Sequence, residues 1–164
     1  TLILAGGVWL WRSQSLSQKA DFELADWQGQ KRSLTELKGK IVVLHFWAAW
    51  CEPCVEELPV LLKVAQKMTS LYPSDLRFVL VSLDQRWEDS LKILKNPEKL
   101  PPEIWALIDP KNQVPESLGS YQYPETYLLD RELNVMTKWV GPQKWENPAF
   151  EELMNRLMKK KLEN

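Results

Sequence analysis

The sequence contains few of the side chains that carry redox or metal chemistry. Among its 164 residues there are two cysteines and one histidine, and they stand close together as His45, Cys51 and Cys54. A framework of several disulfide bridges is therefore excluded. A closed zinc site needs four ligands, so these three side chains would require a carboxylate or a second chain to complete it. A chain of this length can bury an apolar core without such crosslinks.

Neither sign of charge is in excess. Lys and Arg number 21 and Asp and Glu number 22, which gives a net charge of -1. The two signs are mixed along the chain and leave no basic surface of the kind that binds nucleic acid, so we expect no nucleic-acid partner. Apolar residues make up 45% and charged residues 26% of the chain, a balance typical of a globular protein.

The first segment of the chain differs from the rest. Residues 1–11 carry no charge and are mostly apolar, and Arg12 ends the run. This run is too short to span a bilayer, which takes roughly twenty residues. We predict that residues 1–12 are the tail of a membrane anchor or signal segment, that residues 13–20 form a polar tether, and that residues 21–164 form the folded domain. A short core helix or strand is the alternative for the first run.

The pattern of apolar residues predicts alternating strands and helices. Residues 40–47 and 76–83 read KIVVLHFW and LRFVLVSL, runs without polar alternation that are typical of strands covered on both faces. A long helix is expected from Pro53 onward, because apolar residues then follow a helical stripe: Val55, Leu58, Leu61, Leu62, Ala65 and Met68.

The second half of the chain predicts two more helices and a hairpin. Apolar residues between Trp87 and Leu94 mark a second helix. Residues 126–130 and 135–140 flank the turn RELN, a pattern that predicts two antiparallel strands. The Asn147-Pro148 pair predicts the start of a last helix. The order β-α-β-α-β-β-α predicts an α/β fold with a mixed central sheet flanked by helices on both faces.

The two cysteines stand at the expected start of the long helix, with Pro53 in its first turn. A cysteine at a helix N-terminus faces unpaired backbone N–H groups and the positive end of the helix dipole. Both lower the pKa of such a thiol from about 8.5 toward neutrality. We predict that Cys51 is the exposed attacking sulfur and that Cys54, one turn further, is sheltered and resolves the mixed disulfide. The pair is then the redox group, with no metal and no other cofactor.

The segment FWAAWCEPC, followed by Pro59, resembles the active-site segment of the thioredoxin superfamily. Within the superfamily it is most similar to the TlpA/ResA-like thiol-disulfide oxidoreductases of bacterial envelopes. The likeness extends over FELADWQGQKRSLTELKGK, VLVSLD, ALIDP and YPETYLLD, which together cover most of the chain from Phe22 onward. The resemblance implies a thioredoxin-like fold with an N-terminal β-hairpin extension.

The same resemblance implies an activity and its partners. The expected function is a thiol-disulfide oxidoreductase, and more narrowly a reductase of disulfide-bearing envelope proteins, for example in cytochrome c maturation. A membrane thiol reductant would supply the electrons. The domain would work as a monomer in the periplasm or at the outer face of the cytoplasmic membrane, anchored through its N-terminal segment.

Substrate contacts are also implied by the resemblance. Pro124 matches the family's cis-proline, and Tyr123 stands before it where Thr is usual. A cis bond there would turn the Tyr123 backbone toward the substrate for strand-like pairing beside Cys51. Trp50, next to the nucleophile, is expected to be a partly exposed recognition surface.

Glu52 and Pro53 separate the two cysteines and are expected to tune the redox couple. The carboxylate of Glu52 places negative charge next to the thiolate and partly opposes the effect of the helix dipole. A less stabilised thiolate makes the disulfide couple more reducing, which favours a reductase over a strong oxidant.

Two titratable residues are candidates for proton transfer at Cys54. Glu57 lies three residues later on the same helix face and matches a Glu that ResA-like proteins carry beside the active site. The alternative for Glu57 is a surface carboxylate. His45 stands where thioredoxins carry a buried Asp, and strand parity places it opposite Leu44 and Phe46, hence beneath Cys54 if the helix covers its face. The alternative for His45 is a core histidine held by one backbone hydrogen bond.

Three other functions use related features. A peroxiredoxin-like peroxidase wants a Thr or Ser three residues before its reactive cysteine and a proline seven before it, where this chain has Ala48 and Leu44. A copper-binding chaperone with this fold spaces its cysteines more widely and places its histidine in a late loop, and no histidine follows His45. A purely structural interaction module would require both cysteines to be inactive.

Overall fold

The computed structural model describes residues 18–159. The strands are β1 Glu23–Asp26, β2 Lys31–Ser33, β3 Ile41–Trp47, β4 Leu76–Ser82, β5 Ile104–Ile108, β6 Glu125–Leu129 and β7 Val135–Val140. The helices are α1 Glu52–Leu71, α2 Trp87–Ile93, α3 Gln113–Ser117 and α4 Pro148–Lys159, with short 3-10 helices at η1 Leu34–Leu37 and η2 Pro97–Lys99.

All seven strands belong to one mixed sheet in the order β2-β1-β5-β4-β3-β6-β7. The central strands β3, β4 and β5 run parallel, and β6 and β7 continue the sheet in antiparallel fashion. The N-terminal hairpin, β1 with β2, joins the other edge through antiparallel pairing of β1 with β5. The α/β fold, its mixed sheet and its hairpin extension are therefore confirmed.

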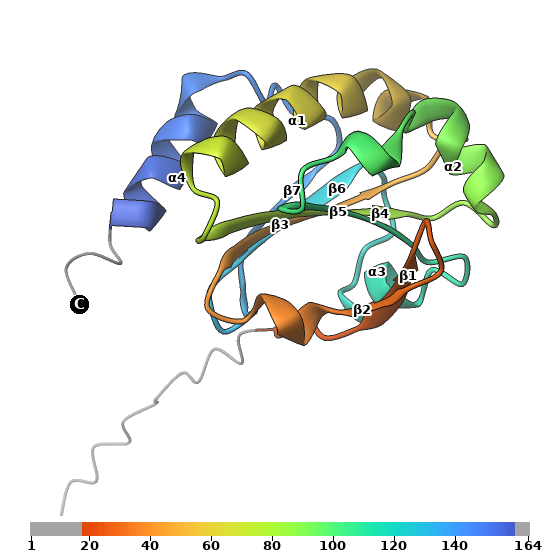
Figure 1. Ribbon diagram of the computed structural model, residues 1–164, viewed down its shortest axis with the longest axis horizontal. Helices are drawn as coiled ribbons and strands as arrows, with labels where there is room; N and C mark the ends of the chain where they lie inside the picture. Colours follow the sequence, from red (N-terminus) through yellow and green to blue (C-terminus); the bar gives the residue numbers. More distant parts are fainter. Residues whose placement is uncertain (1–17, 160–164) are drawn as a thin grey trace, which may run out of the picture.

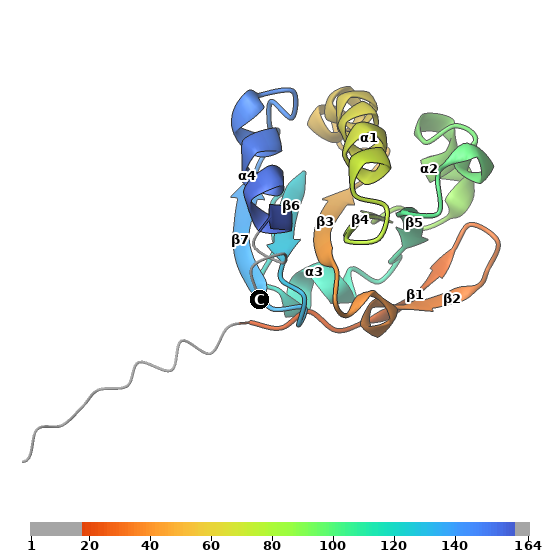
Figure 2. The same cartoon turned by 60° about the vertical axis from the view of Figure 1, so that its left-hand side comes forward.

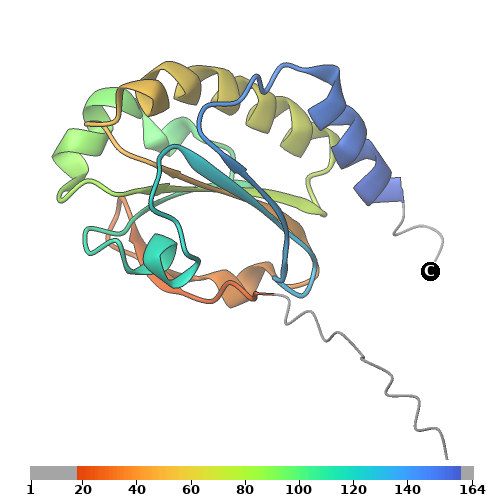
Figure 3. The ribbon, with the colours of Figure 1, turned by 180° about the vertical axis from the view of Figure 1, so that it is seen from behind.

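Helices cover both faces of this sheet. Figures 1 and 2 show α1, α2 and α4 side by side on one face, with α1 over the central strands and α4 over β6 and β7. The view from behind shows α3 on the opposite face, toward which the hairpin edge of the sheet curls (Figure 3). All seven residues of β3 are buried, because neighbouring strands and both layers enclose it. Its carboxyl end leads directly into the cysteine pair.

The strand register decides which face each side chain of β3 meets. His45 pairs with Thr126, which pairs with Trp139, so these three side chains project to one face. The ring of Trp139 packs against Phe150 of α4, with centroids 6.2 Å apart, and this identifies the face as that of α1 and α4. The next pair is Leu44 with Tyr127, which projects to the opposite face.

The first described residues are bound to the end of the sheet opposite the cysteines. Lys19 pairs with Asn134 as an isolated antiparallel bridge, and the Val135 N–H donates to the Gln18 carbonyl at 2.7 Å. The predicted tether, residues 13–20, overlaps this segment from residue 18, and its remainder lies outside the described residues, as does the predicted anchor at residues 1–12. Between residues 18 and 159 there is no helix of the length and apolarity that crossing a membrane requires.

Candidate active site

The two cysteines form a disulfide at the N-terminus of α1. Cys51 is the N-cap residue of the helix, Pro53 lies in its first turn, and the two cysteine Cα atoms are 5.3 Å apart. Cys51 is 7% exposed and Cys54 is fully buried. Cys51 is the more accessible of the two residues, but the predicted exposure of its sulfur is wrong for this disulfide form, in which the residue is buried. The helix start favours its thiolate when the pair is reduced.

A cis peptide bond joins Tyr123 to Pro124 at the start of β6, as the resemblance implies. The Pro124 carbonyl accepts a hydrogen bond from the Gly141 N–H at 2.9 Å, which ties the proline loop to the segment after β7. The ring of Tyr123 meets the ring of Trp50 edge-on, with centroids 6.3 Å apart. This contact places the residue before the cis-proline against the residue before the nucleophile.

The tryptophan of this pair faces outward. Trp50 is 63% exposed, while Tyr123 is half-buried, and burial raises the pKa of the Tyr123 phenol. Tyr121 lies nearby in the chain and is 78% exposed. Large exposed aromatic side chains are typical of interaction surfaces. The structure brings Tyr123 against Trp50, the residue before Cys51, and their role in substrate binding stays a prediction.

A buried carboxylate anchors the loop before the cysteines, and the sequence reasoning missed it. Both carboxylate oxygens of Asp84 lie 3.1 Å from the Ala49 backbone nitrogen. The hydroxyls of Ser82 and Ser90 donate to Asp84 Oδ2 at 2.8 and 2.9 Å. Asp84 therefore ties the active-site loop to the end of β4 and to α2. The sequence indicates this role only through two polar residues, Ser82 at the end of the apolar run of β4 and Asp84 just after it.

Glu57 is buried, with 6% of the residue exposed, so the alternative of a surface carboxylate is wrong. It lies one helical turn beyond Cys54. Its Oε1 accepts hydrogen bonds from the indole N–H of Trp145 and, at 3.3 Å, from the Gln143 backbone N–H. Its Oε2 is buried and has no hydrogen-bond partner. Burial raises the pKa of Glu57, and the two hydrogen bonds oppose that rise.

His45 is fully buried on the α1 face of the sheet. Its Nδ1 lies 2.8 Å from the Thr126 hydroxyl, and its Nε2 has no hydrogen-bond partner. Burial lowers the pKa of His45 to about 3, so the ring is neutral at physiological pH. Moving a proton to such a ring from a thiol of pKa about 8.5 is uphill by about 7.5 kcal/mol. The geometry therefore favours the core histidine, held by a side-chain hydroxyl in place of a backbone group.

Two grooves are lined by residues that stand next to the cysteines in the chain, Trp50 in one and Pro53 in the other. One, of about 580 Å³, lies between α1 and the segment from Pro142 to Pro148, and Pro53 and Glu57 are among the residues that line it. The other, of about 430 Å³, lies on the α2 side and is lined by Ala49, Trp50, Asp84, Gln85, Asp89, Lys92 and Ile93. Neither cysteine lines either groove.

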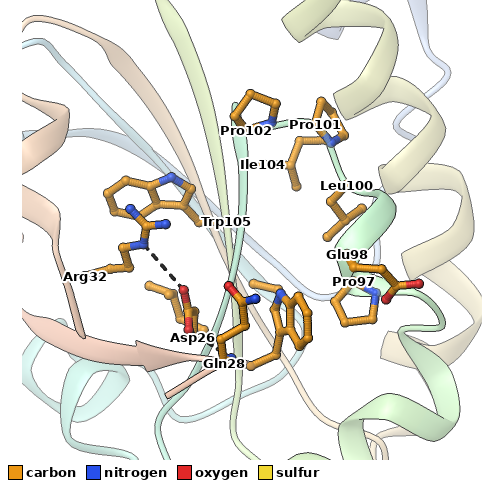
Figure 4. A pocket seen from close by; sticks show the side chains of 13 residues that line it. Asp26, Gln28, Arg32, Pro97, Glu98, Leu100, Pro101, Pro102, Ile104 and Trp105 are labelled. Carbon is orange, nitrogen blue, oxygen red and sulfur yellow. Dashed lines mark hydrogen bonds and ion pairs between the residues drawn. The ribbon is translucent and has the colours of Figure 1, made fainter. Parts of the chain in front are cut away.

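A third groove, of about 390 Å³, lies at the hairpin edge of the sheet (Figure 4). Two of its charged groups form an ion pair, with Arg32 Nε 3.5 Å from Asp26 Oδ2, and the Arg32 guanidinium stacks over the Trp105 ring at 5.4 Å. Neither cysteine nor the cis-proline lines it, so it is separate from the disulfide. Within residues 18–159, no group of three His, Cys, Asp or Glu side chains is placed so that it could hold a metal ion.

Fold and site together define a class of protein. A disulfide at the start of the helix after a central strand, with a cis-proline loop beside it, is the arrangement of a thioredoxin-like thiol-disulfide oxidoreductase. The chain belongs to the AhpC/TSA family, which it matches over residues 16–138. It is an enzyme that exchanges thiols and disulfides through Cys51 and Cys54.

Named relatives agree with this class. The thioredoxin-like protein YneN of Bacillus subtilis is 32% identical over 128 residues, which cover 78% of this chain and 72% of the relative. The thiol-disulfide oxidoreductase ResA of Geobacillus thermodenitrificans is 32% identical over 119 residues, 70% of this chain and 63% of the relative. The chain therefore spans slightly less than two thirds of that ResA protein. The predicted likeness to ResA-like oxidoreductases is confirmed.

Solved structures show the same fold. A thiol:disulfide interchange protein DsbE from Chlorobium tepidum superposes with a TM-score of 0.71 at 31% identity, covering 86% of this chain and 96% of the other. The pneumococcal exposed lipoprotein thioredoxin Etrx1 from Streptococcus pneumoniae superposes with a TM-score of 0.67 at 25% identity, covering 84% and 100%. The thioredoxin-like fold is confirmed.

Proposed function

We propose that this oxidoreductase works as a reductase, and that it opens disulfides in proteins of the bacterial envelope during cytochrome c maturation. The observation that carries the direction of electron flow is Glu52, an exposed carboxylate next to Cys51 at the start of α1. Its negative charge opposes the thiolate that the helix start stabilises. A less stable reduced form gives a more reducing couple.

The reaction proceeds through one mixed disulfide. The Cys51 thiolate attacks a sulfur of the substrate disulfide, and the other substrate sulfur leaves and takes up a proton. Cys54 then loses its proton and attacks the Cys51 sulfur. The second substrate thiol departs and the Cys51–Cys54 disulfide forms. Two electrons have passed to the substrate, and a membrane thiol reductant restores the dithiol.

Glu57 is the group we assign to the proton of Cys54. The two residues are neighbours on one helix face, at the i and i+3 positions. Burial raises the pKa of the Glu57 carboxyl, which brings it closer to that of a thiol and suits it to accept and return a proton. His45 has a lowered pKa and serves packing around the site.

We place the enzyme in the bacterial envelope, as a monomer held at the outer face of the cytoplasmic membrane by residues 1–12. The charge-free run and the polar residues after Arg12 support this placement, as does the description of the structural neighbour Etrx1 as an exposed lipoprotein. Cell fractionation of the full-length protein tests the location, and recovery in the soluble cytoplasm would contradict it.

The decisive test is the reduction potential of the Cys51–Cys54 pair against a glutathione or dithiothreitol series. We expect a value nearer to that of thioredoxin, about -270 mV, than to that of DsbA, about -120 mV. Glu52→Gln should raise the potential by about 10–20 mV, the size of an exposed charge interaction. Glu56→Gln is the matched control, because Glu56 is an exposed carboxylate four residues further along the helix, and it should leave the reduction potential unchanged. A wild-type potential above about -180 mV excludes the reductase direction.

A further inference from the structure

The carboxyl group of Glu57 has two different oxygens. Oε1 accepts hydrogen bonds from two donors, the indole N–H of Trp145 and the backbone N–H of Gln143. Oε2 is buried and has no partner. Trp145 lies 88 residues from Glu57 in the chain and Gln143 lies 86 residues from it. The arrangement is therefore made entirely by the segment between β7 and α4.

These two donors determine which oxygen can carry a proton. An indole N–H and a backbone N–H are donors only, so neither can accept a hydrogen bond from the O–H of a protonated carboxyl group. With both donors on Oε1, the carboxylic acid form of Glu57 is more stable with its hydrogen on Oε2, because a carbonyl oxygen is the better acceptor. The oxygen without a partner is thus the one at which protons arrive and leave.

We propose that Trp145 is a positioning residue for thiol-disulfide exchange: its N–H holds Oε1 of Glu57 as a constant acceptor and leaves Oε2 as the oxygen that trades a proton with Cys54. The inference rests on the proposed role of Glu57 in resolving the mixed disulfide. It assigns a function in the exchange reaction to a residue of the β7–α4 segment.

The ring of Trp145 is held firmly enough for this role. It is 3% exposed and packs edge-on against Phe150 of α4 at 5.1 Å and against Trp139 of β7 at 5.8 Å between centroids. The same segment begins at Gly141, whose N–H donates to the carbonyl of Pro124. One short segment therefore contacts both the cis-proline and Glu57.

The charged groups near Glu57 are exposed or already paired, so they have little effect on its pKa. Glu56 of α1 and Lys144 and Glu146 of the β7–α4 segment line the same groove, but all three side chains are exposed and screened by solvent. Glu151 of α4 is paired with Lys67 at 2.7 Å. His45 of β3 lies on the same face of the sheet and is neutral.

Trp145→Phe tests the inference, because it removes the N–H and keeps an aromatic ring in the cluster. Trp139→Phe is the matched control, a second tryptophan of the cluster whose ring contacts Trp145 and Phe150. The first measurement is the pH midpoint of the Glu57 carboxyl by ¹³C NMR of the full chain, assigned by its loss in Glu57→Gln. The second is the rate at which Cys54 resolves a preformed Cys51 mixed disulfide, followed across pH.

Trp145→Phe removes a hydrogen bond to the charged carboxylate, so the pH midpoint of Glu57 should rise by about one pH unit. The pH dependence of the rate at which Cys54 resolves the mixed disulfide should move to higher pH as well. Resolution below the midpoint then slows by up to about tenfold. Trp139→Phe should leave the midpoint at its wild-type value. If Trp145→Phe fails to fold, benzothienylalanine at position 145 removes the N–H from a ring of the same shape.

The two proposals fail separately. An unchanged Glu57 midpoint in the folded Trp145 variant overturns the role of Trp145, whatever the kinetics show. A resolution profile that Glu57→Gln leaves unchanged overturns the proposed role of Glu57, and with it the catalytic meaning of the Trp145 contact.

Discussion

The ring of Tyr123 contacts the ring of Trp50 edge-on across the active site, with an interplanar angle of 78°. The contact joins the cis-proline loop to the loop that carries the nucleophile. A protein that pairs with the Tyr123 backbone therefore also meets the exposed face of Trp50. We therefore expect both side chains to take part in recognition of the partner.

Tyr123→Thr should weaken the reaction with protein substrates. It removes an aromatic ring that a protein partner would contact, and an aromatic contact of this kind contributes about 0.5–1.5 kcal/mol, so kcat/KM for a disulfide-bearing protein should fall by about 3–10-fold. The rate with oxidised glutathione should stay at its wild-type value, because that substrate is too small to need the aromatic surface. Tyr121→Thr is the control, since Tyr121 is exposed nearby in the same loop. An equal loss with both substrates would show damage to the disulfide itself.

Cys54→Ser should trap mixed disulfides with oxidised substrate proteins, whereas Cys51→Ser should form none. The reason is access, since Cys51 is 7% exposed and Cys54 is fully buried. Non-reducing electrophoresis with mass spectrometry of the adduct is the measurement. Adducts on the Cys51→Ser variant, and none on Cys54→Ser, would reverse the assignment of the two sulfurs.

His45→Asn should change the pH dependence of stability and leave the pH dependence of catalysis in place. Burial lowers the pKa of His45 to about 3. Between pH 6.5 and 3 the histidine is therefore protonated in the unfolded chain and neutral in the folded protein. The free energy of unfolding therefore falls as pH drops from 6.5 toward 3, by about 1.4 kcal/mol per pH unit.

Urea unfolding of the oxidised protein at several pH values measures this slope, which should flatten in His45→Asn because Asn does not titrate. Resolution profiles of the variant and the wild type should superimpose. A shifted profile would mean that His45 takes part in the proton transfer after all.

Glu57→Gln should gain stability relative to the wild type as pH rises. The raised pKa means that the folded protein keeps the proton of Glu57 to a higher pH than the unfolded chain, whose value is 4.5. The wild type therefore loses unfolding free energy as pH rises above 4.5, by about 1.4 kcal/mol for each unit by which the pKa is raised. The variant has no such loss. Urea unfolding at pH 4 and pH 7 measures the difference, with the exposed Glu56→Gln as control, and a constant difference would contradict the raised pKa.

The strands, the long helix and the cysteine pair could be predicted because each leaves a local pattern. An unbroken apolar run is a strand enclosed on both faces, as β3 proved to be. The spacing of Cys51 and Cys54 at a helix start already indicates redox chemistry. The cis bond before Pro124 was predictable from resemblance alone, since a trans bond is the default for any proline.

Other features depend on segments that meet only in the folded protein. Strand parity separates His45 from Leu44 but does not tell which of the two faces α1; the pairing of β3, β6 and β7 decides that. The anchoring of Ala49 by Asp84 joins residues 35 positions apart.

The sequence by itself determined the fold class, the cysteine pair and its place at the start of a helix, because periodicity and short spacings act over a few residues. The tertiary structure alone decided that Glu57 is buried and that Trp145 holds one of its oxygens. The spacing of Glu57 from Cys54 is equally compatible with a surface carboxylate. Burial is a property of what packs against a side chain, and here that neighbour comes from a segment 88 residues further along the chain.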